Sequence, residues 1–442
     1  MGLPTGLAER SRRAFWARLY ARRRLLSHFA APFAPLHYAL IGESRGYRPN
    51  AFFDPSYFRA RANIAQDASL GLLEAYLAHP EPDAPSPSAE FNHGWDVSQN
   101  PGWARSHPHP FLHFLEHGLY AGRRPRADID IEFIRDITRG VKPRSLEEAS
   151  FRVFDRTRSE GEMGPPLNRA ELRARQDRFY AAGQLRVERE VSDSDRSVLV
   201  FVQCGKGFDA AYLAEPRAYD VLLNYYHESD VHPKADIAVV QAGTKTTSIR
   251  RLLELRPDLL LRYQAVLFLD DDIEIDAEGI EALFRAMTAE KLDLAQPALS
   301  ADSATAYAFL KKPSVDASVT QVSSVEIMAP ALTRRALECA GWAFAESVSG
   351  WGTDLLLGPA VRSACGPKSV GVIGSVSARH AAPVDLRAGA YYAFLRRYGV
   401  DPGHEANRIA VDFGVERFLR PLAPGEAGET CRAPWRAQDS SA

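Results

Sequence analysis

Three consecutive aspartates, Asp270, Asp271 and Asp272, follow four apolar residues in the segment VLFLDDDIEID. Carboxylates this close repel one another, so without a cation or hydrogen-bond donors nearby at least one of them should bind a proton. A hard divalent ion such as Mg2+ or Mn2+ prefers oxygen ligands and completes its shell with water and substrate phosphates. The run therefore indicates a metal site, although a solvated strand end or a helix cap explains the same residues.

Three later segments carry groups that fit such a site. Glu326 lies in SVEIMAPALTRRALECAGW, which we expect to form an apolar strand leading into a helix. Asp354 follows a Gly-Trp-Gly segment that lets the backbone approach a ligand closely, and His380 ends the predicted strand SVGVIGSVSARH. Each residue also has an interpretation without catalysis or metal binding. Asp354 suits a helix N-cap, Glu326 suits an acid paired with a neighbouring group, and His380 suits a histidine whose hydrogen bonds are satisfied within the fold. Lys245 and Arg250 could meet phosphate, but surface positions at a helix start explain them equally well.

Four short apolar runs are predicted to position the aspartates, at residues 197–204, 219–226, 236–243 and 264–270. Continuous apolar runs of this length are typical of buried parallel strands. The helical patterns TSIRRLLELRPDLLLRY and AEGIEALFRAMTAEK lie between and after them, and this alternation predicts a doubly wound sheet. Ligands of such sheets collect at the carboxyl ends of the strands, where the aspartates stand.

The N-terminal part contains an internal repeat with a period of about 38 residues, a length typical of stacked helical units. The segment HYALIGESRGYRPNAFFDPSYF is echoed two periods later by HFLEHGLYAGRRPRADIDIEFI, and a weaker copy lies halfway, with Asn92 at the position of Asp54 and Asp130. Each Asp or Asn is predicted to cap the following helix. The middle copy has Pro80 where the others have glycine, so its helix should end differently.

The first 30 residues are strongly basic, with seven arginines against Glu9 between residues 9 and 24. The apolar side chains there can share a helix face: Phe15, Trp16, Leu19, Tyr20 and Leu26. An interfacial helix on anionic lipid has this pattern, and so does a basic first helix packed on its own domain. We leave both interpretations open.

The bulk properties favour an intracellular globular protein. The net charge of -2 predicts no affinity for nucleic acid, and no apolar run approaches the roughly 18 residues needed to cross a bilayer. The four scattered cysteines form no Cys-x-x-Cys pair, which argues against a disulfide framework and favours a reducing cytoplasm. We expect five segments: a basic amphipathic helix (1–30), helical repeats (31–140), a connector with one helix (141–195), the sheet domain (196–420) and a disordered tail (421–442).

Two resemblances follow from these motifs. The repeats resemble the Gly-Arg-x-Pro…Phe-Asp-x-x-Tyr repeats that accompany glycosyltransferases of bacterial surface-polysaccharide assembly. Residues 197–385 resemble glycosyltransferases of the GT-A fold and, more closely, the domain-of-unknown-function family seven hundred and seven. Five segments carry this second resemblance, in order: VLFLDDDIEID, LAQPALS, VEIMAPALTRRAL, GWGTDLLLG and VGVIGSVSARH. Together they imply a GT-A-like doubly wound mixed α/β sheet with an N-terminal all-α repeat region.

The resemblance also implies roles on the donor side of a site. Asp270 and Asp272 would bind Mn2+ or Mg2+, with His380 as a further ligand or as a partner of the ligands. Asp270 would also help to hold the nucleotide-sugar, and Asp271 could play either part.

On the acceptor side, Asp354 would be the general base that takes the proton of the acceptor hydroxyl. Thr353 stands where many relatives have a second acid, so Asp354 would act alone or with Glu346. Three further residues would line the substrate site: Glu326, Trp351 and Gly352.

The resulting expectation is a metal-dependent glycosyltransferase, acting on a glycan or lipid-linked acceptor in cell-surface polysaccharide or glycolipid synthesis. It would lie in the cytoplasm or peripherally at the inner face of the membrane. The main alternative is a non-catalytic nucleotide-sugar-binding or scaffold protein of a polysaccharide-assembly complex, docked through the repeats. A haloacid-dehalogenase-type phosphatase is disfavoured, because Ile273, Glu274 and Ile275 follow the aspartates where that class has a Gly-Thr or Thr-like pair.

Overall fold

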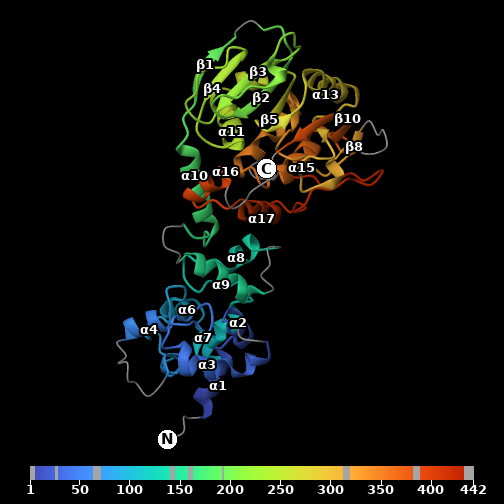
Figure 1. Cartoon of the computed structure of the whole chain (residues 1–442). Helices are drawn as coiled ribbons and strands as arrows, with labels where there is room; N and C mark the ends of the chain where they lie inside the picture. Colours follow the sequence, from blue (N-terminus) through green and yellow to red (C-terminus); the bar gives the residue numbers. More distant parts are fainter. Residues whose placement is uncertain are drawn as a thin grey trace, which may run out of the picture. The chain divides into compact units, whose positions relative to one another are not determined.

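The computed structural model has two compact units, Met1–Leu172 and Arg173–Ala442 (Figure 1). It describes residues 5–24, 28–62, 71–139, 145–157, 163–191, 194–311, 319–381 and 389–432. The unit boundary falls within one helix, α10 (Arg169–Ala181), and each unit has its own hydrophobic core. We describe the two units one after the other.

Short helices make up most of the first unit. They are α1 (Thr5–Arg13), α2 (Ala17–Arg23), η1 (His28–Phe33), α3 (Ala34–His37), η2 (Tyr38–Gly42), α4 (Pro55–Ala62), α5 (Leu72–Leu77), α6 (His93–Gln99), η3 (Trp103–Arg105), α7 (Pro110–His113), η4 (Phe114–Gly118), α8 (Ile131–Ile137) and α9 (Leu146–Thr157). Their shared core is rich in aromatic rings such as Phe52, Tyr76 and Phe114, all fully buried.

The predicted helix caps of the repeats are present in all three copies. The side chains of Asp54, Asn92 and Asp130 accept hydrogen bonds from backbone N–H groups three residues later, at 2.9 to 3.0 Å. In the first and third copies a wide π-helical turn ends at Gly42 and Gly118. The middle copy, which carries Pro80, has no such turn, and its helix α5 ends at Leu77.

The basic N-terminal segment packs on its own unit. Phe15 and Tyr20 are buried in the core of the unit. Three of its arginines form ion pairs with acids of later helices: Arg13 with Glu116, Arg22 with Glu148, and Arg23 with Asp155. This arrangement is the one that the own-domain interpretation expects, with Phe15 and Tyr20 buried and Trp16 and Leu19 packed against the same core. Leu26 lies outside the described residues. No helix in the described ranges is both long enough and apolar enough to cross a bilayer.

The second unit is built on one mixed sheet with the order β1-β4-β3-β2-β5-β9-β7-β10-β6, and β8 pairs with β10. The strands are β1 (Arg186–Glu190), β2 (Val198–Cys204), β3 (Asp220–Tyr225), β4 (Ile237–Val240), β5 (Ala265–Asp270), β6 (Ile273–Glu274), β7 (Leu294–Leu299), β8 (Val319–Gln321), β9 (Ala331–Thr333) and β10 (Val370–His380). Strands β4, β3, β2 and β5 are parallel, β9 runs antiparallel between β5 and β7, and β7 is parallel to β10. This GT-A-like order confirms the predicted fold class and the four predicted parallel strands.

Helices cover both faces of this sheet, as the continuous burial of its central strands requires. Leu199 and Phe201 face one core, which α11, α14, α15 and α17 complete, while Val200 and Val202 face the other, beneath α13 (Figure 1). The helices are η5 (Ala211–Leu213), α11 (Lys245–Leu255), α12 (Asp258–Leu261), α13 (Ala277–Ala289), η6 (Ala308–Leu310), α14 (Arg334–Ala340), η7 (Gly341–Ala345), α15 (Thr353–Cys365), α16 (Ala390–Arg397) and α17 (Pro402–Asp412).

Three local expectations differ from the structure. The segment 141–195 contains α9, α10 and the edge strand β1, not one helix. The strand forms because the charged sequence RVERE alternates exposed and half-buried residues, which suits the border of the sheet. Glu326 lies in a loop before β9, not in a strand. Residues 421–432, which we expected to be disordered, pack on the second unit. Leu422 N–H donates to Gln321 O at 2.9 Å and Cys431 N–H to Pro359 O at 3.2 Å.

Candidate active site

Each of the three aspartates at the end of β5 has its own partner. Asp270 Oδ1 lies 2.8 Å from Lys245 Nζ. Asp271 Oδ2 accepts a hydrogen bond of 3.1 Å from the backbone N–H of Gly205. Asp272 Oδ2 lies 3.2 Å from His380 Nε2. The repulsion that the sequence implied is therefore relieved by two cationic side chains and one backbone donor.

The sheet topology explains how these partners meet. Gly205 directly follows β2, whose last residues run parallel to the end of β5. His380 is the last residue of β10 and pairs with Ile273 of β6, so the antiparallel β6–β10 ladder places it beside Asp272. Both partners thus reach the aspartates through strand neighbours that are distant in sequence.

Lys245 is the first residue of α11, whose N-terminus is closed by a capping box between Thr244 and Thr247. Its side chain is 6% exposed, and Nζ also donates to Met328 O at 3.0 Å. Burial lowers the pKa of Lys245 below its ordinary value, although Asp270 opposes this shift. The sequence analysis named Lys245 without assigning it to the site, and the structure makes it the counter-charge of Asp270.

His380 is held as a cation in this arrangement. Its hydrogen bond to Asp272 raises its pKa to about 9, and Nδ1 lies 2.6 Å from Ala304 O. Burial opposes the ionisation of Asp272, but the hydrogen bond and the charge of His380, together with a backbone hydrogen bond and the charge of Lys245, outweigh it and leave the pKa of Asp272 below its usual range. Burial raises the pKa of Asp270 and of Asp271.

A divalent ion fits part of the predicted ligand set. Two ligands on adjacent corners of an octahedron, each roughly 2.1 Å from the metal, are roughly 3 Å apart. The 3.2 Å between Asp272 Oδ2 and His380 Nε2 suits such a pair once Nε2 has lost its proton. Asp270 is held by Lys245, and the ligand atoms of Asp270, Asp272 and His380 do not all lie within 4.8 Å of one another in the described part of the chain. Of the three expected ligands, the structure therefore brings only Asp272 and His380 together.

Asp354 stands at the start of α15, behind a backbone that only glycine adopts easily. Gly350 and Gly352 have φ of 78° and 91°, and a Cβ on Gly352 would meet Ile409 Cδ1 at 2.7 Å. Gly352, not Asp354, is the N-cap residue. Asp354 Oδ1 accepts hydrogen bonds from the N–H groups of Gly352 and Leu355, at 2.9 and 3.0 Å. Burial still raises the pKa of Asp354 to about 6.

Glu326 lies in the same electrostatic neighbourhood. Its side chain is buried, and both carboxylate oxygens accept hydrogen bonds from Thr305 Oγ1, at 3.2 and 3.1 Å. Burial, assisted by the charge of Asp354, raises the pKa of Glu326 to about 7, while His380 opposes the shift. Asp354 and His380 thus both lie close enough to Glu326 for their charges to act on its pKa.

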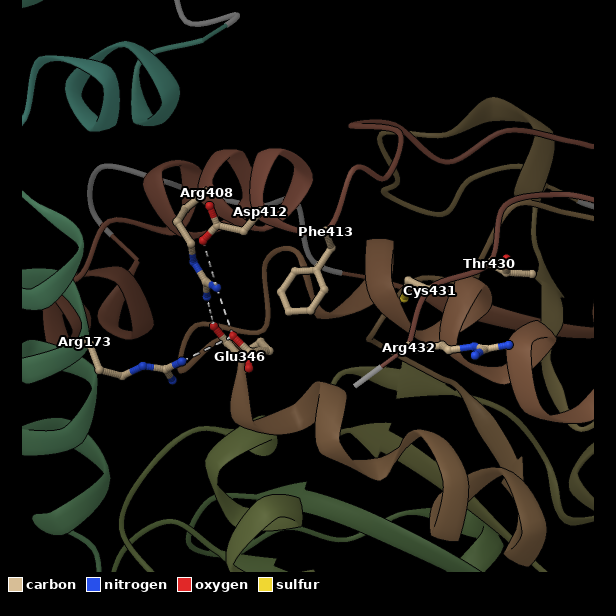
Figure 2. A pocket seen from close by; sticks show the side chains of 8 residues that line it. All are labelled: Arg173, Glu346, Arg408, Asp412, Phe413, Thr430, Cys431 and Arg432. Atoms are coloured by element: carbon tan, nitrogen blue, oxygen red, sulfur yellow. Dashed lines mark hydrogen bonds and ion pairs between the residues drawn. The ribbon is translucent and has the colours of Figure 1, made fainter. Parts of the chain in front are cut away.

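Glu346, which we expected to assist Asp354, is bound by two arginines. Its carboxylate is bound by Arg408, with Nη1 2.9 Å from Oε2, and by Arg173 at 3.5 Å (Figure 2). Both arginines line a cavity of about 460 Å³ that also contains Asp412 and Phe413. Arg408 of α17 thus fixes the carboxylate of Glu346 in this cavity, and its assistance to Asp354 stays a prediction.

The remaining predicted residues, Trp351 and Gly352, belong to the loop that leads into α15. Glu405 of α17, which is fully buried, holds the first part of this loop by accepting hydrogen bonds from the backbone N–H groups of Val348 and Ser349, at 3.1 and 2.9 Å. No local motif in the sequence marked Glu405, because it lies far along the chain from the loop that it positions.

Comparison with known proteins agrees with the resemblance seen in the sequence. Residues 217–393 match the family described as "Protein of unknown function (DUF707)". This span covers the aspartate run, Glu326, Asp354 and His380, so the second unit carries a domain of that family. No curated protein matches the chain.

Solved structures with similar folds include GT-A glycosyltransferases. S. aureus TarS is 11% identical, with a TM-score of 0.29 over 49% of this chain and 42% of TarS. Glucosyl-3-phosphoglycerate synthase from Mycobacterium tuberculosis, in complex with Mn2+, uridine diphosphate and phosphoglyceric acid, is 12% identical, with a TM-score of 0.30 over 47% of this chain and 80% of that chain. This chain therefore spans less than half of the length of TarS.

Proposed function

We propose that this protein is a metal-dependent glycosyltransferase that moves a sugar from a nucleotide-sugar donor to a hydroxyl group of its acceptor. One observation carries the proposal: His380, the cation at the acidic strand end, and Asp354 both act on the pKa of Glu326, and burial raises the pKa of Asp354 itself to about 6. A leaving diphosphate needs cations, and an acceptor hydroxyl needs a base. Both requirements can be met by the residues of one site.

On the donor side, Asp272 and His380 would hold Mn2+ or Mg2+. Asp270 and Asp271 would bind the nucleotide-sugar, with Lys245 balancing the charge of Asp270. When bound, the ion would act as a Lewis acid on the leaving diphosphate. His380 must give up its Nε2 proton to become a ligand, and its pKa of about 9 sets the cost of that step.

On the acceptor side, Asp354 would take the proton of the attacking hydroxyl. The acceptor oxygen would bond to the anomeric carbon of the sugar, the bond from that carbon to the phosphate oxygen would break, and the nucleoside diphosphate would leave. A positioned base typically contributes 10²–10⁴-fold to the rate. Trp351 and Gly352 would border the acceptor, and Glu326 would face the sugar.

The cellular role is a second part of the proposal. A repeat unit of this kind suits docking to a polysaccharide-assembly complex, and the acceptor would be a glycan or a lipid-linked sugar of the cell surface. Cys204, Cys339, Cys365 and Cys431 are all free thiols, which fits a reducing compartment such as the cytoplasm.

The first experiment is isothermal titration of the full chain with UDP, GDP and CDP, in Mn2+ and in EDTA. We expect one nucleotide to bind only with metal, and Asp272→Ala to abolish that binding. Glu274→Gln is the matched control, since Glu274 is a nearby acid whose side chain is 61% exposed and pairs with Arg379. Binding that survives in Asp272→Ala, or that is absent from the folded wild-type chain, would contradict the donor site.

The same titration tests His380 as a ligand. If Mn2+ displaces the Nε2 proton of His380, binding at pH 7 should release close to one proton, which is measured by comparing buffers of different ionisation enthalpy. In His380→Gln this release should disappear. Proton release of the same size in the variant would remove His380 from the site.

Turnover is tested with the sugar form of the nucleotide that binds, by assaying release of the nucleoside diphosphate. A folded Asp354→Asn variant that still binds the nucleotide should turn over 10²–10⁴-fold more slowly.

A further inference from the structure

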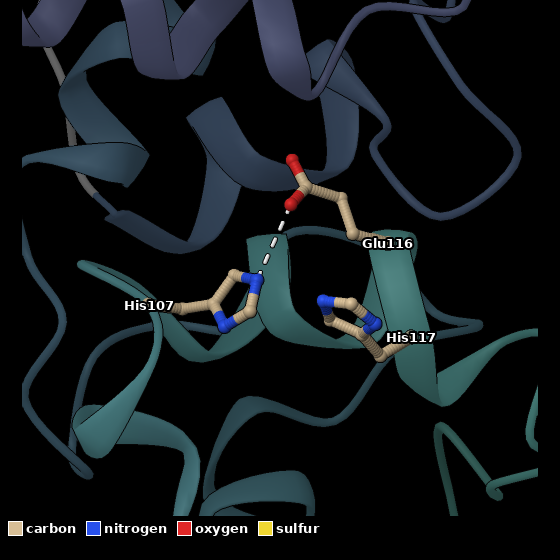
Figure 3. A group of neighbouring side chains, drawn as sticks. All are labelled: His107, Glu116 and His117. Atoms are coloured by element: carbon tan, nitrogen blue, oxygen red, sulfur yellow. Dashed lines mark hydrogen bonds and ion pairs between the residues drawn. The ribbon is translucent and has the colours of Figure 1, made fainter.

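A cluster of metal-ligating side chains lies in the first unit, in the third copy of the repeat. One ligand atom from each of His107, Glu116 and His117 lies within 4.8 Å of the other two (Figure 3). Glu116 and His117 are neighbours on η4, and His107 follows the short helix η3. No part of the proposed sugar-transfer chemistry uses these residues.

The geometry of the cluster is compact. His107 Nε2 lies 3.2 Å from Glu116 Oε2, and the rings of His107 and His117 have centroids 4.8 Å apart at an interplanar angle of 79°. Figure 3 shows a ring nitrogen of His117 turned toward His107. The side chain of His107 is only 6% exposed and that of Glu116 is 29% exposed, whereas His117 is exposed to solvent. An ion could therefore enter from the His117 side.

Neighbouring side chains hold two of the three candidate ligands, Glu116 and His107, in place. Arg13 binds both oxygens of Glu116, with Nε 2.7 Å from Oε1 and Nη2 2.6 Å from Oε2. His107 Nδ1 lies 2.8 Å from Ser106 Oγ, a hydroxyl that can donate or accept. Ser106 therefore also suits the tautomer in which Nδ1 carries the proton and Nε2 offers its lone pair to a metal. Such outer hydrogen bonds are what orients the ligands of metal sites in proteins.

The repeat itself shows that its scaffold does not need these side chains. In the first copy, two periods earlier, the positions of His107, Glu116 and His117 are occupied by Ala31, Leu40 and Ile41. Leu40 and Ile41 are exposed, so neither position is a core position of the repeat. The third copy thus places three coordinating groups together at positions where the first copy has none.

We propose that His107, Glu116 and His117 form a binding site for a divalent transition-metal ion, with Zn2+ as the best match. Imidazole nitrogen with a carboxylate suits Zn2+, whereas Mg2+ and Ca2+ prefer oxygen ligands alone. The protein supplies three ligands, and water completes the tetrahedron. His113 is adjacent, but its ring accepts a hydrogen bond of 3.2 Å from Arg123 and is not one of the three. Through Arg13, the ion would brace the η3–η4 segment against α1.

The test uses the full chain without a polyhistidine tag, in an Asp272→Ala background that disables the strand-end aspartates of the second unit. After dialysis against EDTA, the protein is titrated with Zn2+ by calorimetry and with Co2+ by visible absorption. We expect one equivalent of each, and d–d bands typical of tetrahedral Co2+.

Two variants decide the outcome. His117→Gln changes an exposed side chain, and it should weaken Zn2+ binding by at least the roughly 10–100-fold that loss of an outer partner costs. His79→Gln is the matched control, because His79 occupies the same repeat position one period earlier and its side chain is 69% exposed. Equal affinity of His117→Gln and the background protein, or no binding by the background protein, would overturn the site.

Discussion

Replacing Asp354 by Asn tests which role its carboxylate has. A catalytic carboxylate would destabilise the fold, whereas a structural one would stabilise it. Asp354 is held at the start of α15 by two backbone N–H groups that both donate to Oδ1. The carboxamide oxygen of Asn can accept the same two hydrogen bonds, so the substitution removes the charge and leaves the local geometry in place. Asparagine also has nearly the same volume as aspartate.

The pKa shift gives the size and the sign of the stability change. Burial raises the pKa of Asp354 from 3.8 to about 6, and one pKa unit corresponds to about 1.4 kcal/mol. Between those two values the folded chain binds more protons than the unfolded chain, so stability falls as pH rises through this window. The full cost, reached above the folded-state pKa, is about 3 kcal/mol. Solvent screening of the half-buried side chain reduces it to about 1–2 kcal/mol.

We therefore expect Asp354→Asn to be more stable than the wild type by about 1–2 kcal/mol at pH 8 and equally stable at pH 4. Urea denaturation at both pH values measures this difference. Asp276→Asn is the matched control, because Asp276 is a true N-cap that accepts a 2.7 Å hydrogen bond from Gly279 N–H. Asn caps a helix as well as Asp does, so this variant should show no such gain. An Asp354→Asn variant that is less stable than the wild type at pH 8 would refute the reasoning and make the carboxylate a structural element.

Two further predictions concern buried charges. Lys245→Met should cost about 1–3 kcal/mol of unfolding free energy, because it leaves the carboxylate of Asp270 without its cation. A neutral result in thermal and urea denaturation would mean that solvent alone balances Asp270. Arg48→Ala should cost about 3–5 kcal/mol, since Arg48 and Glu90 form an ion pair of 2.6 Å with both side chains 8% exposed. Arg124 occupies the same repeat position but is 56% exposed, so Arg124→Ala should cost less than about 1 kcal/mol of unfolding free energy. Equal losses of stability in Arg48→Ala and Arg124→Ala would contradict the role of burial.

Local sequence patterns were enough to predict the strands and helix caps that depend only on residues close together in the chain. The four apolar runs became β2, β3, β4 and β5 because a strand buried on both faces needs continuous apolar side chains. The three caps of the repeats formed because an Asp or Asn side chain reaches an N–H three residues away in the same chain. Neither inference required knowledge of what lies across the fold.

Partners that are distant in sequence could not be inferred in the same way. Arg13 finds Glu116 in a much later helix, and an amphipathic pattern alone does not say whether lipid or protein covers a helix face. Glu346 was expected to assist Asp354 because Thr353 stands in place of a second acid, yet its carboxylate has a partner far along the chain, Arg408 of α17. In both cases the deciding residue comes from an element whose position only the tertiary fold fixes.

The partners of the aspartate run change how its chemistry should be understood. Three carboxylates at a strand end suggested that a metal is needed to relieve their repulsion, but Lys245 and His380 already supply two cations. A divalent ion must therefore compete with a proton on His380, whose pKa is about 9, so its affinity should rise with pH until that proton is lost. Because His380 is a cation only while it is protonated, it stabilises the metal-free site, and as a neutral imidazole it would become a ligand. The same hydrogen-bonded pair thus supports the fold without metal and offers a ligand pair when metal arrives.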